Sequence, residues 1–212
     1  EIFSTLNQNK LRTTLTGLSV SWGIFILIIL LGAGNGLRNG VMHNFQSRAV
    51  NMVTLWSGRT SMPHMGLKSG RNLQFSDKEM DVVKNEVPES RYISAQGNRN
   101  MTIAYGSEYG LYTVRGVMPD YLHIEKLIIA PDDGRFINNL DIKNENKVIV
   151  IDRKIEETLF KGKSAIGNYV KVNDLMYKVV GVNSKKPGWG GPRSYIPFST
   201  YQTIYNPNRK FN

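Results

Sequence analysis

The chain has 212 residues, no cysteine and a formal net charge of +10, and its mean hydropathy is −0.30. This length fits one domain with its own core, or one domain plus a membrane anchor, and the hydropathy excludes an integral membrane bundle. The lack of cysteine excludes disulfide scaffolds, zinc–thiolate sites and catalytic thiols. The cations are scattered among acids without a basic helix, so we expect no nucleic-acid partner.

An uncharged apolar run extends from Thr13 to Leu37. As a helix it covers roughly 37 Å, against a hydrocarbon core of about 30 Å. We therefore predict a transmembrane helix at 13–37, after a cytoplasmic lead-in at 1–12. A cleavable signal peptide has a shorter apolar region, and a buried core helix is rarely apolar on every face. Cations flank both ends, so charge alone does not fix the orientation, and we place the long polar segment outside the cytoplasm.

Beyond the span, Leu37, Val41, Phe45 and Ala49 recur every four residues, which predicts that the helix continues out of the membrane. We name this continuation, at 38–50, the stalk helix. The alternative is a helix that ends near Gly40 and becomes a linker.

The remaining segment, 51–212, alternates helices with pairs of strands, which predicts an α+β domain with a mixed sheet. A capping box of Ser76 and Glu79 begins a helix that ends before Pro88. The expected strands are 51–57, 91–96, 100–105, 109–117, 146–151, 169–174 and 175–182. A loop is expected at 58–72, turns at 97–100, 106–108 and 131–135, and helices near 118–126, at 152–160 and at the end of 195–205.

Two glycine-containing stretches imitate nucleotide-binding motifs without completing them. In "GAGNGLRNG", Leu37 stands where the dinucleotide fingerprint requires its third glycine. In "FKGKSAIG", Glu157 stands where a phosphate loop requires its first glycine, so Lys163 is interpreted as a turn lysine. We expect no cofactor in this chain.

The glycines of the first stretch are better explained by helix packing. Gly32, Gly36 and Gly40 fall near one face of a helix, in the small-xxx-small spacing that allows two membrane helices to approach closely. The alternative is that they only loosen the helix where it leaves the membrane.

Catalytic and metal-binding patterns are weak in this sequence. Met62, His64 and Met65 are soft ligands that could hold copper, but one short cluster supplies few ligands without fixed geometry. Asp132 and Asp133 precede Gly134 and are interpreted as turn residues. We therefore predict no catalytic and no metal site.

The stretch "KKPGWGGPR" sets one tryptophan among glycines and cations. Trp189 and Arg193 are candidate contacts for a partner, because aromatic and arginine side chains dominate binding energy at interfaces. The alternative is that Trp189 folds back onto the sheet.

Five collinear segments resemble the permease subunits of MacB-type ABC transporters, the macrolide-exporter and lipoprotein-releasing group. The first is "NKLRTTLTGLSVSWG" with the glycine stretch behind it. "VRGVMPDYLHIEKLIIAPDDGRFINNLD" is similar to the family pattern of Gly-Val, Pro, Tyr, Gly-Arg-Phe and Asp. The others are "KVIVIDRKIEETLF", "AIGNYVKVNDLMYKVVGV" and "YIPFST". The matching residues of the second segment are Gly116, Val117, Pro119, Tyr121, Gly134, Arg135, Phe136 and Asp141.

The resemblance implies a first transmembrane helix followed by a periplasmic core domain at 51–212, incomplete at its C-terminal end, in the bacterial inner membrane with the residues after about 38 in the periplasm. It implies a permease moved by a cytoplasmic ATPase domain or subunit, by mechanotransmission, to export or extract a substrate on the outer side. The implied partners are a second copy or a paired permease, a periplasmic adaptor and an outer-membrane channel. The fragment itself is then not an enzyme.

Two other classes share some of these features. An extracytoplasmic sensor domain of a membrane-anchored receptor would also have one anchor and a mixed fold. An anchored hydrolase would need a nucleophile or metal site, which the motifs do not supply. The permease interpretation predicts that the reading frame continues for about 200 residues, with about three more spans of about 20 apolar residues each.

Overall fold

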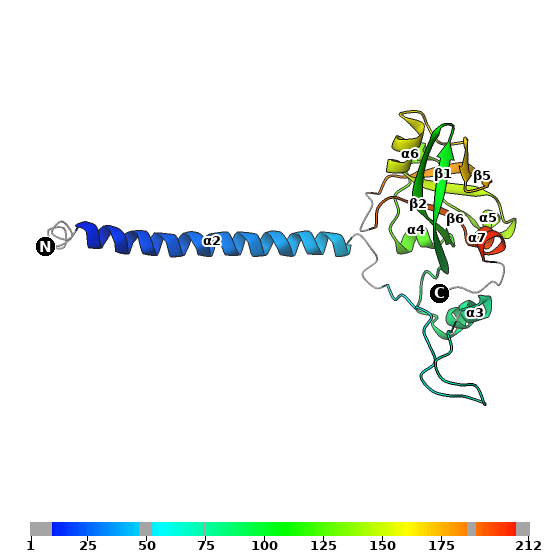
Figure 1. Ribbon diagram of the computed structural model, residues 1–212, viewed down its shortest axis with the longest axis horizontal. Coiled ribbons are helices and arrows are strands. Elements are labelled where there is room, and N and C mark those ends of the chain that lie inside the picture. The colour runs from blue at the N-terminus through cyan, green and yellow to red at the C-terminus, as the bar shows by residue number, and fades with distance from the viewer. Residues whose placement is uncertain (1–9, 47–51, 74, 186–189, 207–212) are drawn as a thin grey trace. The chain divides into compact units, whose positions relative to one another are not determined.

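A computed structural model describes residues 10–46, 52–73, 75–185 and 190–206. The chain forms two compact units, Glu1–Ser47 and Arg48–Asn212. Among its described residues the first unit is helix α2, at Lys10–Gln46, and the second contains a β-barrel with helices (Figure 1). The predicted α+β class, with a mixed sheet and one long apolar N-terminal helix, is confirmed.

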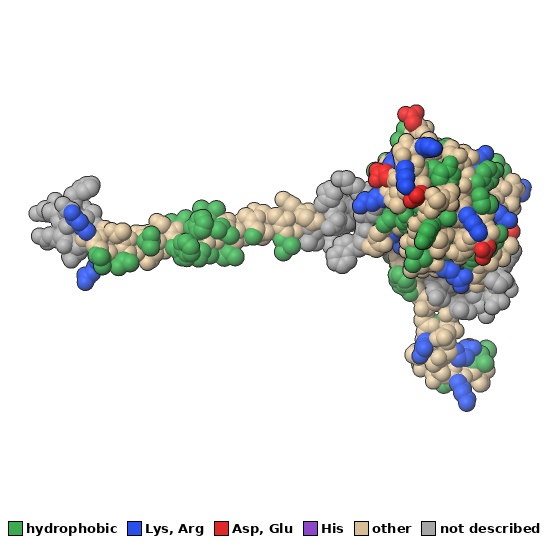
Figure 2. Space-filling model, turned by 45° about the horizontal axis from the view of Figure 1, so that its top comes forward, with side chains coloured by type: hydrophobic (Ala, Val, Ile, Leu, Met, Phe, Trp, Pro, Cys, Tyr) green, Lys and Arg blue, Asp and Glu red, His purple; other side chains and the backbone are tan. Residues whose placement is uncertain are grey.

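Helix α2 is an uninterrupted run of 37 residues, and apolar side chains gather in its middle (Figure 2). Its segment Lys10–Gly40 is long and apolar enough to cross a membrane. Polar side chains within it are satisfied locally: Thr14 Oγ1 donates to Lys10 O at 2.7 Å and Ser19 Oγ to Leu15 O at 2.8 Å. Such bonds allow hydroxyl groups to lie in a helix that faces lipid. The helix continues to Gln46, so the alternative that it ends near Gly40 is wrong.

Six strands close into a barrel in the order β1-β2-β6-β3-β5-β4. The sheet is mixed, since β2 pairs with β6 and β3 with β5 in parallel, while the other four pairs are antiparallel. Closure leaves no free sheet edge among these strands. Their bounds are β1 Gln96–Tyr105, β2 Glu108–Val117, β3 Val148–Asp152, β4 Tyr169–Val172, β5 Leu175–Asn183 and β6 Arg193–Pro197.

The barrel core is filled from inward-facing positions that alternate along the strands. In β4 the pattern is exposed, buried, exposed, buried, with Val170 and Val172 fully buried. Strand β3, "VIVID", is buried at all five positions, because its outer face is covered as well. That outer cover contains Tyr121, Phe136 and Tyr195.

Helices cover the barrel and contribute side chains both to the barrel core and to the outer cover. Helix α6 buries Ile155, Leu159 and Phe160, and the Phe160 ring stacks on Tyr105 with centroids 4.0 Å apart. The predicted capping box at the start of α3 is present, since the backbone N–H of Ser76 donates to Glu79 Oε2 at 2.7 Å. The helical bounds are α3 Asp77–Glu86, α4 Tyr121–Ile124, a 3₁₀ turn at Pro131–Asp133, α5 Asn139–Lys143, α6 Arg153–Phe160 and α7 Phe198–Tyr205.

The predicted turn at 97–100 is wrong, because β1 continues through it and pairs with β2 along its whole length. Gly97 lies opposite Gly116 in this pair. A Cβ atom at either position would come within 2.3 Å of the Tyr201 side chain. The two glycines therefore leave room for an aromatic ring from α7 on the sheet, which is a packing role and not a turn. The predicted strand at 91–96 is also wrong, since β1 begins only at Gln96.

The segment before α3 differs from its prediction in two ways. Residues 52–57, expected as a strand, form none, and Val53 and Trp56 are 82% and 71% exposed. Among the described residues, no strand pairing involves this segment. The expected loop at 58–72 instead contains a short two-stranded hairpin, joined at Arg59 with Asn72 and at His64 with Leu67.

Candidate functional site

The predicted packing glycines lie on α2, where Gly32, Gly36 and Gly40 have no atom within 4 Å of a Cβ built on them. This open space fits the predicted approach of a second helix, which stays a prediction. The apolar face of the stalk helix, Val41 and Phe45, falls on side chains outside those described.

The second predicted site is the connection between β5 and β6. Trp189 lies outside the described residues. Arg193 begins β6 and is half-buried, and its backbone N–H donates to Asp152 Oδ2 at 2.7 Å. A Cβ atom at Gly190 would lie 3.3 Å from Arg193 Nη2, so this guanidinium lies beside the glycines of the connection.

Asp152 holds together the two ends of this connection. It is 2% exposed at the end of β3, between β5 and β6 in the barrel. It accepts from the Arg193 backbone and, at its other oxygen, from Asn183 Nδ2 at 2.7 Å. Burial raises the pKa of the Asp152 carboxyl, and these hydrogen bonds act in the opposite direction. The buried carboxylate therefore fixes where the connection leaves β5 and enters β6.

Further hydrogen bonds join the end of β5, where this connection begins, to the segment after α4. Asn183 Oδ1 accepts from the backbone N–H groups of Ile128, at 3.0 Å, and Lys185, at 3.2 Å. Lys185 Nζ donates to the carbonyl oxygen of Glu125. Sequence reasoning missed the role of Asp152 and Asn183 in this connection. An acid directly after the apolar strand expected at 146–151 and an asparagine directly after the one expected at 175–182 are signals that could have found it.

Aromatic side chains line the outer face of the barrel near Asp152. The Tyr195 ring lies 5.9 Å from Tyr121 and 6.0 Å from Phe136, measured between centroids. Arg115 Nη1 donates to the Tyr121 hydroxyl. Burial raises the pKa of both tyrosines, so these phenols are neutral at physiological pH. The cluster acts in packing and presents no ionised nucleophile.

The Gly-Arg-Phe and Asp motif also has a structural explanation. Arg135 pairs with Asp141 through two hydrogen bonds of 2.6 and 3.1 Å. Asp141 is 1% exposed, and it caps α5 together with Asn138. Burial acts to raise the pKa of Asp141, but hydrogen bonds from Arg135, Asn146 and Asn138 outweigh it and lower this pKa. Gly134 has a positive φ of 81° and passes directly against β5 at Gly181.

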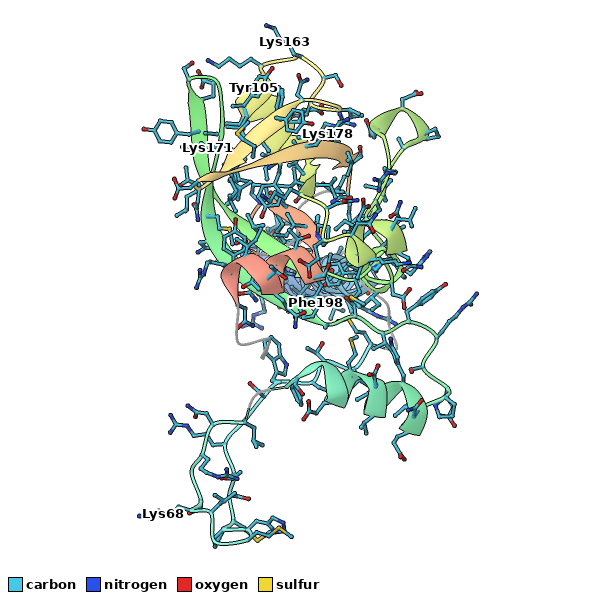
Figure 3. All side chains as sticks on the ribbon, turned by 90° about the vertical axis from the view of Figure 1, so that its right-hand side faces the viewer. Lys68, Tyr105, Lys163, Lys171, Lys178 and Phe198 are labelled. Carbon is cyan, nitrogen blue, oxygen red and sulfur yellow. The ribbon has the colours of Figure 1, made fainter. Side chains whose placement is uncertain are left out.

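The residues considered above as catalytic or metal-binding candidates lie in separate parts of the structure. Lys163 lies in the exposed turn after α6 (Figure 3), as interpreted from the sequence, and Asp133 lies in a 3₁₀ turn where it pairs with Arg153. His64 is in the hairpin, whereas the His123 ring stacks on Tyr92 at 4.5 Å. Among the described residues, no three His, Cys, Asp or Glu side chains are grouped as a metal site would need.

Residues 13–211 match the family model of the MacB-like periplasmic core domain. The macrolide export ATP-binding/permease protein MacB of Bdellovibrio bacteriovorus is 27% identical over 191 residues, which is 90% of this chain and 29% of that protein. The protein of the same name from Aggregatibacter actinomycetemcomitans is 25% identical over 210 residues, covering 96% of this chain and 31% of its own length. The chain thus spans about a third of these relatives.

Two solved structures share the fold. The periplasmic region of MacB from Actinobacillus actinomycetemcomitans superimposes with a TM-score of 0.62 at 19% identity, covering 82% of this chain and 77% of that one. The extracellular domain of the noncanonic ABC-type transporter YknZ from Gram-positive bacteria gives a TM-score of 0.57 at 25% identity, covering 65% and 70%. The family match over nearly the whole chain confirms the resemblance seen in its motifs, and the chain belongs to the MacB-like periplasmic core domain family of ABC transporter permeases.

Proposed function

We propose that this chain supplies the first membrane span and the extracytoplasmic core of a permease that is moved by ATP hydrolysis in a cytoplasmic domain or subunit. The movement exports or extracts a substrate on the outer side of the bacterial inner membrane. The observation that carries the proposal is the continuity of α2 from Lys10 to Gln46.

A continuous helix suits the transmission of displacement. At about 1.5 Å per residue, α2 is roughly 55 Å long, whereas crossing the hydrocarbon core takes about 30 Å. The remainder extends outside the core as a helix without an internal proline. A helix with unbroken backbone hydrogen bonds moves as one body, so a push at one end reaches the other.

The partners follow from the same arrangement. Gly32, Gly36 and Gly40 offer a face for the corresponding helix of a second copy or a paired permease. Trp189 and Arg193 are proposed as contacts for a periplasmic adaptor, which would connect to an outer-membrane channel. ATP binding is assigned to the cytoplasmic domain or subunit, and the proposal requires neither a cofactor in this chain nor nucleic acid.

The proposal is tested by making α2 flexible in the assembled transporter. A Gly-Gly-Ser-Gly insertion after Val41 interrupts the helix, and a four-alanine insertion at the same point is the control that keeps it helical. Since the chain has no cysteine, a spin label at Ser107→Cys reports one position on the barrel. Distances between labels in paired copies are measured with and without ATP.

We expect the alanine insertion to preserve the ATP-dependent change in distance and the glycine insertion to abolish it, while ATP hydrolysis continues in both. An equal change in distance with the glycine insertion would refute mechanotransmission through α2.

A further inference from the structure

The hairpin at 58–73, which we name the basic hairpin, is held by backbone hydrogen bonds between its two arms. Thr60 N–H donates to Arg71 O at 2.9 Å, and Leu73 N–H donates to Gly58 O at 2.7 Å. His64 and Leu67 exchange hydrogen bonds of 3.1 and 3.0 Å around Met65 and Gly66, which both have positive φ. Two such residues form the tight turn that suits a β-hairpin. These hydrogen bonds join the two arms of the hairpin to each other.

Apolar side chains of this ribbon are exposed instead of packed. Met62 is 75% exposed, Met65 89% and Leu67 47%, and they surround the turn. Trp56, just before the hairpin, is 71% exposed. Large apolar side chains grouped on an exposed element mark an interaction surface, since each would gain by leaving water.

The charge of the region has a single sign. No aspartate or glutamate occurs from residue 2 to residue 76, although the chain contains 17 acids. The basic hairpin contributes Arg59, Lys68 and Arg71, and Lys68 lies near its turn (Figure 3). Cations beside tryptophan, methionine and leucine, without acids, are the composition of segments that lie at a membrane surface.

The hairpin is also attached close to the proposed membrane span. Eleven residues separate Gln46, the end of α2, from Gly58, and eleven residues extend at most roughly 40 Å. Helix α2 continues about 14 Å past Leu37, so this connection is long enough to return to the membrane surface. A free protein partner would have to be captured from solution, whereas the lipid surface is within reach at all times.

We infer that the basic hairpin lies on the anionic headgroups of the membrane that α2 crosses, with Met62, Met65 and Leu67 inserted at the level of the headgroups. This rests on the membrane span of the proposed function. The hairpin then holds one side of the extracytoplasmic unit against the bilayer. Each cation near an anionic surface favours the bound state about five-fold, so Lys68 and Arg71 together contribute roughly 25-fold.

The experiment uses the full chain reconstituted in vesicles. An environment-sensitive fluorophore is attached at Ser69→Cys in the hairpin and, separately, at Ser107→Cys on the barrel. The vesicles consist of phosphatidylcholine alone or of phosphatidylcholine with phosphatidylglycerol, each with and without brominated chains that quench by contact. We expect quenching at position 69 with phosphatidylglycerol, weaker quenching with phosphatidylcholine alone or in high salt, and none at position 107.

Two double variants separate local charge from total charge. Lys68→Gln with Arg71→Gln should shift the hairpin off the surface by roughly 25-fold, whereas Lys163→Gln with Lys178→Gln, two exposed barrel lysines, should have no effect. Equal quenching with the hairpin variant, or no quenching at position 69, would overturn the inference. Protection of position 69 only after a protein component is added would also overturn it, in favour of a protein partner.

A third label separates this inference from the proposed function. A fluorophore at Leu27→Cys reports whether α2 lies in the hydrocarbon core. Quenching at position 27 without quenching at position 69 would refute the inference and leave the membrane span intact. Absence of quenching at both would refute the membrane span itself.

Discussion

Replacing Gly134 by alanine should destabilise the barrel far more than the same replacement at Gly162. Both glycines have positive φ, 81° and 86°, so both substitutions place a side chain in the left-handed region. A Cβ at Gly134 would lie 2.3 Å from the carbonyl oxygen of Val180, whereas a Cβ at Gly162 would meet no atom within 4 Å. Comparing the two substitutions therefore separates the cost of backbone strain from the cost of steric overlap.

The expected cost at Gly162 is the conformational term alone, about 1 kcal/mol. At Gly134 the same term is joined by overlap with a backbone atom, which typically adds about 1–3 kcal/mol. The neighbouring hydrogen bond from Arg135 N–H to Val180 O, 2.9 Å long, is at the same crossing and cannot move independently. We expect a total of about 2–4 kcal/mol for Gly134→Ala.

The measurement is denaturant unfolding of the detergent-solubilised chain, followed by near-ultraviolet circular dichroism. The buried tyrosines Tyr177 and Tyr195 report loss of barrel packing, and α2 contributes no tyrosine to this signal. An excess cost at Gly134 over Gly162 of about 1–3 kcal/mol corresponds to roughly 2–12 °C in a unit of this size. Equal costs at the two positions would refute the close crossing of the chain at Gly134.

Three further predictions concern a carboxylate, the core and α2. The lowered pKa of Asp141 means that its stabilisation is present above the unfolded value near 4 and is lost as pH falls through the folded value. Asp141→Asn should therefore cost about 1–3 kcal/mol at pH 7 and less at pH 3 in denaturant titrations, and a cost independent of pH would contradict this. Ile155→Ala, at a fully buried position of α6, should cost about 2–5 kcal/mol in the same titration, against less than about 0.5 for the exposed Glu157→Ala; similar values would contradict the packing. Gly36→Leu should weaken pairing of α2 with a second helix, measured by cross-linking in the membrane, while Gly34→Leu, off the shared face, should not, and the barrel should stay folded in both. Identical cross-linking in the two variants would contradict the predicted packing face.

Local signals in the sequence predicted the elements whose stabilisation is local. The capping box of Ser76 and Glu79 located the start of α3, and the strand expected at 169–174 contains β4. The turn predicted at Gly97 failed because glycine there makes room for Tyr201, which is more than a hundred residues further along the chain. Barrel closure likewise depends on pairs between distant strands, such as Ile103 with Val172, and no local pattern encodes them.

In the candidate site, too, local sequence patterns point to single residues, whereas the contacts between distant residues become visible only in the fold. Arg193 was singled out with Trp189 because arginine and aromatic side chains dominate binding energy at interfaces. Asp152 and Asn183, which hold that connection in place, are separated by 31 residues and meet only because β3 and β5 pair in parallel. The motif residues Arg135 and Asp141 were recognised by resemblance, and their role as an ion pair emerged only from the folded arrangement.

The register of the barrel places its entrance and its exit side by side. Gln96, the first residue of β1, lies opposite Val117, and Val117 pairs in turn with Pro197, the last residue of β6. A module whose two ends meet can be inserted into a host domain without separating the host segments that flank it. Such a module can be exchanged or extended in related proteins without changing the host segments that flank it.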